Sequence, residues 1–252
     1  MAKIFLDVGG FRGDSALAAL DPRFAFDRVY CFEPVGSCFT GIVARLSDPR
    51  LQVVNAGLLD RNEELPIYHA GSLGGSVYAD APDVGGLDRE TCRFIRATDF
   101  FREHISAGSQ VWMKLNCEGA ECDVLLDLLD SGEAVKLTEV LLDLDARKIP
   151  SAQGKLQRLT DRLEDAPFSY HFPEEVQYTM VTNYGGIRNW LIVTGALEPG
   201  WRSFFRSLIY QHRPALDPTV NGYYKIRLLR ALKLREPAGV PTRPHALIGR
   251  AR

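Results

Sequence analysis

The sequence predicts an α/β fold in which helices cover a doubly wound, mostly parallel sheet. Short apolar runs recur along the chain, and most are followed by a turn and by apolar residues at helical spacing. The first run, residues 4–8, leads directly into a glycine-rich turn. The chain has 252 residues, of which 46% are hydrophobic and 25% charged, enough for a packed core of this kind.

The turn after the first run contains Gly9, Gly10 and Gly13. Glycines allow a sharp turn and the close approach of a ligand, as in the strand–turn–helix unit that binds nucleotides at the end of a first strand. The spacing differs from the G-x-G-x-x-G pattern of dinucleotide sites. Asp7 would repel a pyrophosphate and suits a ligand with an ammonium or sulfonium group. S-adenosylmethionine (SAM) is such a ligand.

A second apolar run, residues 29–32, ends on Glu33 and Pro34. Proline cannot extend a strand ladder, so the strand is expected to stop where Glu33 is presented. An acid about 20 residues after the glycine turn is placed to accept hydrogen bonds from ribose hydroxyls. Taken alone, Glu33 is better explained as a solvated acid at a strand end. In register with the glycine turn it favours a nucleoside site.

The middle of the chain predicts two further strands and a long loop. A third strand is expected at residues 51–56, and an edge strand at residues 64–68, which contain a proline. Residues 70–91 are rich in Gly, Ser, Asp and Pro, and we expect them to form a lid or a substrate-binding loop. A helix is expected to follow, with Thr98 or Asp99 as its cap.

The second half repeats the alternation and then closes on an antiparallel pair. The expected elements are a strand, a helix, a strand, a helix and two hairpin strands, at residues 111–116, 117–129, 140–145, 151–165, 176–181 and 189–193. The sheet is therefore expected to have seven strands, the last two forming an antiparallel terminal hairpin.

The segment Lys114-Leu115-Asn116-Cys117-Glu118-Gly119-Ala120-Glu121 is close to a Lys-Ile-Asp-Val-Glu-Gly-Ala-Glu motif. With Leu6-Asp7-Val8-Gly9, Phe32-Glu33-Pro34, Val54-Asn55-Ala56 and Gly75-Ser76, it makes residues 4–145 resemble the FkbM family of SAM-dependent methyltransferases. The resemblance implies a Rossmann-like class I methyltransferase fold and O-methylation, often of sugar or polyketide hydroxyls. Asn116 departs from the family, which usually has Asp there.

We expect the cofactor SAM to be bound by residues at or just after the ends of four predicted strands, at residues 4–8, 29–32, 51–56 and 111–116. These residues are Asp7, Gly9, Gly10, Gly13, Glu33, Pro34, Asn55 and Asn116. The expected catalytic residues are Glu118, Lys114 and Asn116. Glu118 is the candidate general base, and the alternative is an acid that favours a helix N-terminus.

The other polar residues near the fourth strand have open roles. Lys114 either pairs with Glu118 or Glu121 or orients the acceptor, and Asn116 binds the methionine amino group or the acceptor oxygen. His171 is the alternative base. No metal is expected, because the spacing of the acids does not support a divalent ion held by Glu118 and Asp143 or Asp145.

Charge divides the chain into an acidic domain, residues 1–197, and a basic C-terminal extension, residues 198–252. The extension holds 11 Lys and Arg against 3 Asp and Glu, and the rest of the chain 19 against 29. Residues 223–235 predict an amphipathic helix that either contacts a membrane or a lipid-linked glycan or packs on the core, and a mobile tail is expected after it. The five cysteines lack metal spacing, which favours reduced thiols and a cytoplasmic location, with contact at the inner face of the membrane as an option.

These observations favour an SAM-dependent O-methyltransferase that acts on a hydroxyl of a saccharide, a glycan or a related bacterial metabolite. The alternative is a non-catalytic SAM- or nucleoside-binding partner of a glycan-assembly enzyme, with Asn116 as a sign of lost catalysis. A nucleic-acid partner is not expected, because the chain lacks the Asn/Asp-Pro-Pro-aromatic signature of amine methylation and the aromatic-studded RNA-binding modules.

Overall fold

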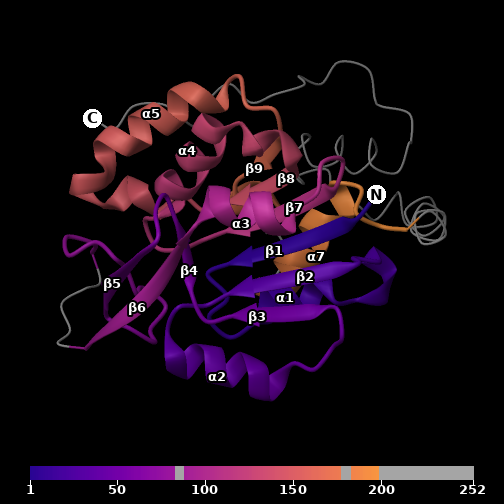
Figure 1. Ribbon diagram of the computed structural model, residues 1–252, viewed down its shortest axis with the longest axis horizontal. Helices are drawn as coiled ribbons and strands as arrows, with labels where there is room; N and C mark the ends of the chain where they lie inside the picture. The colour runs from indigo at the N-terminus through magenta and orange to yellow at the C-terminus, as the bar shows by residue number, and fades with distance from the viewer. Residues whose placement is uncertain (83–87, 177–182, 199–252) are drawn as a thin grey trace, which may run out of the picture.

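The computed structural model describes residues 1–82, 88–176 and 183–198. A six-stranded sheet lies at its centre, in the order β3-β2-β1-β7-β8-β9 (Figure 1). Its strands are β1 Lys3–Val8, β2 Arg28–Phe32, β3 Leu51–Val54, β7 Gln110–Leu115, β8 Leu137–Leu142 and β9 Ser169–His171. Every pair in this sheet is parallel. The predicted α/β fold with a doubly wound parallel sheet is confirmed.

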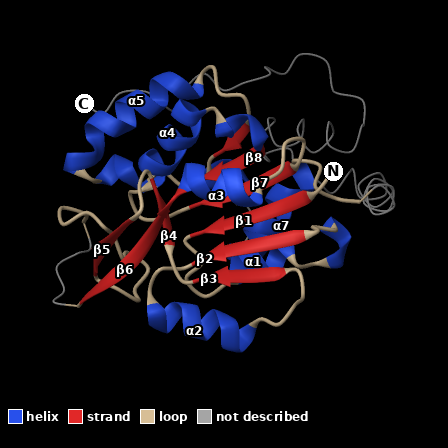
Figure 2. Cartoon of the chain, in the orientation of Figure 1, coloured by secondary structure: helices blue, strands red, loops and turns tan. Residues whose placement is uncertain are grey.

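Helices cover both faces of this sheet, so its strands are apolar on both sides (Figure 2). Phe5 of β1 packs with residues of α1, α2 and α7 on one face, and Leu6 packs with residues of α3, α4 and α5 on the other. The helices are α1 Asp14–Ala19, α2 Gly36–Arg45, α3 Ala97–His104, α4 Glu121–Ser131, α5 Gln153–Leu163, α6 Pro173–Val176 and α7 Asn183–Val193.

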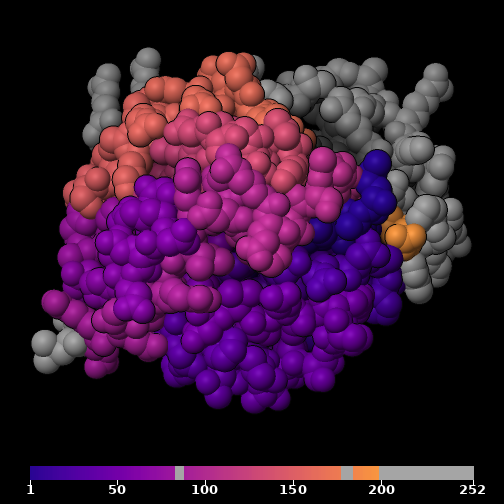
Figure 3. All heavy atoms as spheres, in the orientation of Figure 1, coloured from indigo at the N-terminus to yellow at the C-terminus, as the bar shows by residue number. Residues whose placement is uncertain are grey.

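The strand order reverses between β1 and β7. From β1 the chain winds outward through β2 and β3, and it then returns to place β7 on the other side of β1. In the space-filling view the early, indigo part of the chain and the later, magenta to orange part accordingly fill different halves of the molecule (Figure 3). Such a switch point leaves a crevice at the carboxyl ends of the two central strands.

A smaller, three-stranded sheet is inserted between β3 and β7. Its order is β4-β6-β5, with β4 Gly57–Leu59, β5 Glu63–Tyr68 and β6 Arg89–Arg96. The expected edge strand is β5, which lies at an edge of this small sheet and not of the central one. The expected loop 70–91 is shorter than predicted because β6 begins at Arg89 and Ser76 forms a bridge with Tyr68.

The predicted terminal hairpin is corrected by the structure. Residues 189–193 belong to α7, where Trp190 and Leu191 are completely buried, and residues 177–181 lie outside the described part. A short run that is mostly apolar has no period that separates a helix from a strand. The strand next to β8 is instead the short β9, and it is parallel.

The expected cap of α3 is also corrected. Arg96 occupies the N-cap position, and Thr98 lies in the first turn. The amide of Thr98 donates to Asp127 Oδ2 of α4 at 2.8 Å, so a neighbouring helix satisfies this helix end.

Of the expected extension, residues 198–252, the structure describes only Glu198. The expected helix at residues 223–235 therefore lies outside the described residues. Among the helices that the structure describes, none has the length and apolar character to span a bilayer.

Candidate functional site

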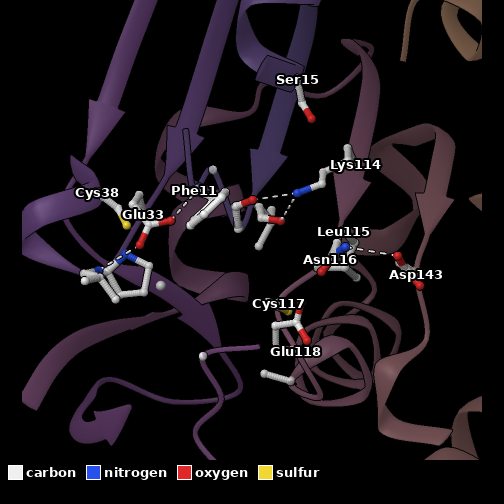
Figure 4. A pocket seen from close by; sticks show the side chains of 18 of the residues that line it. Phe11, Ser15, Glu33, Cys38, Lys114, Leu115, Asn116, Cys117, Glu118 and Asp143 are labelled. Atoms are coloured by element: carbon white, nitrogen blue, oxygen red, sulfur yellow. Dashed lines mark hydrogen bonds between the residues drawn. The ribbon is translucent and has the colours of Figure 1, made fainter. Parts of the chain in front are cut away.

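A cleft opens at the switch point, at the carboxyl ends of β1, β2, β7 and β8. It has about 1270 Å³ of space free of atoms, the open solvent at its mouth included. Figure 4 shows Glu33 on one side of it, and Asn116, Glu118 and Asp143 on the other. The small sheet adds an apolar wall with Leu58, Ile67 and Phe94.

The glycine turn after β1 forms the floor between these sides. The amides of Gly9 and Gly10 donate to the carbonyl of Phe32 at 3.2 and 2.9 Å. Gly9 has a φ of 82°, and a Cβ there would lie 1.8 Å from the carbonyl oxygen of Asn116. The turn can therefore pass this close to β7 because residue 9 has no side chain.

Gly9 and Gly10 line the cleft as expected, but Gly13 does not. Gly13 packs against Leu46 and Ile42, where a Cβ would lie 3.0 and 3.2 Å from their side chains. Gly13 thus serves the packing of α1 against α2, which corrects its expected contact with the cofactor.

Glu33 lies in the wall of the cleft, where the sequence places it, and is 5% exposed. Its Oε2 accepts from the amide of Phe11 at 2.7 Å, and its Oε1 accepts from the amide of Val35 at 2.9 Å. Burial raises the pKa of Glu33, and these two amides oppose the rise. Each carboxylate oxygen has two acceptor sites, so one site on each is left for a ligand hydroxyl.

Asn55 stands behind Glu33 and does not line the cleft. Its Nδ2 donates to the carbonyls of Glu33 and Pro34, both at 3.1 Å. The expected contact of Asn55 with the cofactor is therefore replaced by support of the strand end that presents Glu33. Pro34 itself lines the cleft.

Asp7 is completely buried and does not line the cleft, which corrects its expected contact with a cationic ligand. Its Oδ2 accepts from the amide of Ala16 at 3.1 Å, and its Oδ1 lies 3.3 Å from Nζ of Lys114. Burial raises the pKa of Asp7, and Lys114 opposes the rise. Asp7 thus ties the start of α1 to β7 behind the turn.

Lys114 pairs with Asp7 and not with Glu118 or Glu121. Its Nζ also donates to the carbonyls of Gly9 at 2.6 Å and Val8 at 3.2 Å. Lys114 therefore makes two hydrogen bonds to carbonyls of β1 and its turn, and it forms an ion pair with Asp7. Lys114 lines the cleft, but its contacts correct the expected catalytic role to that of holding the turn.

Asn116 lies across the cleft from Glu33. Its Nδ2 donates to Oδ2 of Asp143, which follows β8, at 3.0 Å. Burial raises the pKa of Asp143, and the nearby Asp145 and Glu174 raise it further. This side of the cleft is therefore acidic and suits a positively charged or neutral group.

Glu118 lines the same acidic side and is partly buried. Burial, with the charges of Asp145 and Glu121, raises the pKa of Glu118 to about 8. A carboxyl group whose pKa lies near neutral pH is suited to general acid–base chemistry. Among the predicted site residues, Glu118 is the one whose position and pKa fit the role of a base.

His171, the alternative base, does not reach the cleft. It is 1% exposed on β9, and its Nε2 lies 3.1 Å from Oε2 of Glu139. The structure thus excludes direct contact between His171 and a ligand in this cleft.

Sequence reasoning gave no site role to Ser76 and Tyr78 and named Asp143 only as a metal ligand. A signal for Asp143 exists, because it follows the fifth predicted strand at the same sheet edge as Asn116. Ser76 lies in an irregular loop, whose path no periodicity predicts. In the described residues, no group of His, Cys, Asp and Glu is arranged to hold a metal ion.

No protein-family model, curated protein or solved structure matches this chain. We therefore infer its function from the geometry of the cleft and from the sequence motifs.

Proposed function

We propose that this chain is an SAM-dependent methyltransferase of the FkbM type that methylates a hydroxyl of a saccharide or a related metabolite. The observation that carries the proposal is the position of Glu33 beside the glycine turn at the switch point. This is the place where doubly wound sheets bind the ribose of nucleotide-like ligands. The acidic side opposite Glu33 supports a ligand with a sulfonium and an ammonium group rather than a pyrophosphate.

The two ends of the cleft differ in a way that fits such a ligand. Val35, Leu58 and Phe94 offer an apolar surface for an adenine ring near Glu33. Asn116 and Asp143 present amide and carboxylate oxygens on the other side. The methionine part of SAM would be held there, with the acceptor approaching from the side of Glu118.

SAM supplies an electrophilic methyl group when bound. The protein has to hold the acceptor oxygen in line with that group and away from water, and positioning of this kind contributes about 7–11 kcal/mol. Glu118, in its ionised form, would accept the proton that the acceptor hydroxyl loses as the new C–O bond forms and the bond between the methyl group and sulfur breaks, which leaves a neutral thioether. A general base adds about 10²–10⁴-fold for an alcohol of low acidity.

The second candidate is a binding protein that holds SAM without turnover, acting as a partner of a glycan-assembly enzyme. The observation that favours it is Asn116, an amide where the family usually has an acid, engaged with Asp143. An amide cannot accept a proton as a base. Transfer of a labelled methyl group separates the two candidates.

The purified protein should bind SAM, and Glu33→Ala should weaken binding at least about 30-fold, because hydrogen bonds to a charged group contribute about 1.5–3 kcal/mol each. Isothermal titration calorimetry measures this. Glu64→Ala, at an exposed acid of β5 outside the cleft, is the matched control and should leave the affinity unchanged. Equal affinity in the two variants, or no binding by the native chain, contradicts the proposal.

Methyl transfer should accelerate as the pH rises through about 8, because the raised pKa keeps Glu118 mostly protonated at pH 7. Glu118→Gln should lower the rate by about 100-fold and remove this pH dependence. The measurement is transfer from methyl-labelled SAM to a panel of glycans between pH 6 and pH 9. Glu103→Gln, an exposed acid on α3, is the control. A Glu118→Gln variant with the native rate and profile would exclude Glu118 as the base.

A further inference from the structure

The turn that carries Glu118 has an unusual backbone. Glu118 has a φ of 53°, in the left-handed region, and the next residue, Gly119, has a φ of 114°. This conformation costs a residue with a side chain about 1–2 kcal/mol. Strained backbone of this kind persists only where its surroundings hold it, and it clusters at functional sites.

The carboxylate of Glu121 binds the backbone amides of the residues before and after Glu118. Its Oε1 accepts from the amides of Cys117 at 2.9 Å and Gly119 at 3.0 Å. Its Oε2 accepts from the amide of Ala146 at 3.3 Å, in the 3-10 helix η3 (Asp145–Lys148) that follows β8. A fully buried carboxylate thus links the turn to a second segment at the cleft.

Above the turn, Ser76 fixes the carbonyl of Glu118. Its Oγ donates to that oxygen at 2.5 Å. Ser76 is 1% exposed, and its amide and carbonyl pair with Tyr68 of β5 at 3.0 and 2.8 Å. Ser76 thus connects the small sheet, through Tyr68, to the carbonyl of Glu118.

Tyr78 closes the remaining side. Its ring lies against Gly119, where a Cβ would be 3.1 Å from the ring and 2.2 Å from Ile149. Its hydroxyl donates to Asp123 Oδ2 of α4 at 2.7 Å. Residue 119 has no room for a side chain, so the path of the chain around Glu118 is fixed from several directions.

We infer that Glu121 and Ser76 are positioning residues, which together hold the side chain of Glu118 at the cleft in the orientation needed for proton transfer. The inference rests on the proposed role of Glu118 as a base. Neither residue lines the cleft, so both act through Glu118 and not on a ligand directly.

Glu121 also acts through its charge. The charged groups that act on Glu118 are Glu121 of α4 and Asp145 and Lys148 of η3. Glu121 and Asp145 raise the pKa of Glu118, and Lys148 lowers it. Removing the charge of Glu121 should therefore lower the pKa of Glu118, whereas removing the hydroxyl of Ser76 should loosen the turn without changing any charge.

The test is a carbon-13 NMR titration of the Glu118 carboxyl group in the full chain, between pH 5 and pH 9.5, with the signal assigned by its loss in Glu118→Gln. In the native chain the midpoint should lie near 8. In Glu121→Gln it should fall by about one pH unit, the size expected for loss of a neighbouring like charge. A midpoint that does not move in Glu121→Gln overturns the inference.

Ser76→Ala provides a second test, which can still be made if Glu121→Gln does not fold. Hydrogen exchange at the amides of Cys117 and Gly119 should become at least about 10-fold faster in it, while the Glu118 midpoint stays within about 0.3 units of native. Unchanged exchange at both amides contradicts the role of Ser76.

Asp127→Asn is the matched control, because Asp127 is a buried acid of the same helix that accepts an amide hydrogen bond, from Thr98, away from the turn. It should alter neither the midpoint nor the exchange at the turn. An equal change in this variant would show that general destabilisation moves both. None of these samples contains SAM or an acceptor, so the titration and the exchange measurements are independent of SAM binding. Failure of the native chain to bind SAM would refute the proposed function. A Glu118 midpoint that does not move in Glu121→Gln would refute the positioning role alone.

Discussion

Replacing Gly9 by alanine should destabilise the protein by at least about 4 kcal/mol, a value seen only where a substitution breaks a special structural feature. The new Cβ would lie 1.8 Å from the carbonyl oxygen and 2.9 Å from the carbonyl carbon of Asn116. Both atoms are backbone, so no side chain can move aside. Either β7 or the turn has to shift, and both form the floor of the cleft. Urea unfolding followed by circular dichroism measures the loss.

Gly108 offers a matched control for this substitution. It has the same φ of 82°, and a Cβ there meets nothing within 4 Å. Gly108→Ala should therefore report the cost of the left-handed backbone alone, about 1–2 kcal/mol. The difference between the two variants isolates the close approach of the turn to β7. Equal losses in the two variants would mean that the turn does not pass β7 this closely.

Replacing Lys114 by methionine should cost about 3–5 kcal/mol, because it leaves the charge of Asp7 buried without its partner. Asp7 is completely buried, and the Lys114 side chain is 13% exposed. The loss should shrink as the pH is lowered, since protonation removes the charge of Asp7, whose pKa is already raised by burial. Thermal unfolding across a range of pH gives both quantities.

The double variant Asp7→Asn/Lys114→Met tests whether the pair acts as a unit. It contains no buried charge at this place, so it should be more stable than Lys114→Met alone. Asp7→Asn alone should cost less than Lys114→Met, because the lysine keeps the carbonyls of Val8 and Gly9 as acceptors. If the losses of the two single variants simply add, the two residues do not form the coupled pair described above.

The central strands are predictable because the sheet is buried on both faces. Mostly apolar runs at residues 4–8, 29–32 and 111–116 correspond to β1, β2 and β7 within one or two residues. Helices that cover both faces make such runs necessary. Of the small sheet, only β5 was expected, because β4 has three residues and the eight residues of β6 include only three apolar ones, Cys92, Phe94 and Ile95.

The prediction of α7 failed for a related reason. Residues 189–193 form an apolar run that ends in β-branched residues, and two glycines before them resemble a turn. In the structure both glycines lie inside the helix, which packs on α1. Contacts with α1 and the core therefore outweigh the local preference of the run, as tertiary packing often does.

In the candidate site, the positions of the glycine turn and of Glu33 could be predicted from the sequence. The burial of the Asp7 side chain outside the cleft could not. Asp7 and Lys114 are partners in the register of β1 and β7, each one residue before the end of its strand. An acid and a lysine at equivalent positions of two strands indicate an ion pair once the strands are known to be neighbours. The strand order, which the sequence determines poorly, is the missing information.

The position of the cleft has a consequence for how a ligand can be enclosed. In many two-lobed proteins, two rigid lobes rotate about a hinge and close over the ligand. Here the strands that bear the two walls, β2 and β7, both pair with β1, along five and six residue pairs of one parallel sheet. The two walls therefore belong to one continuous sheet, and they cannot rotate relative to each other as two lobes would. Any adjustment to ligands of different size has to come from segments outside the central sheet, such as residues 70–76 of the insertion.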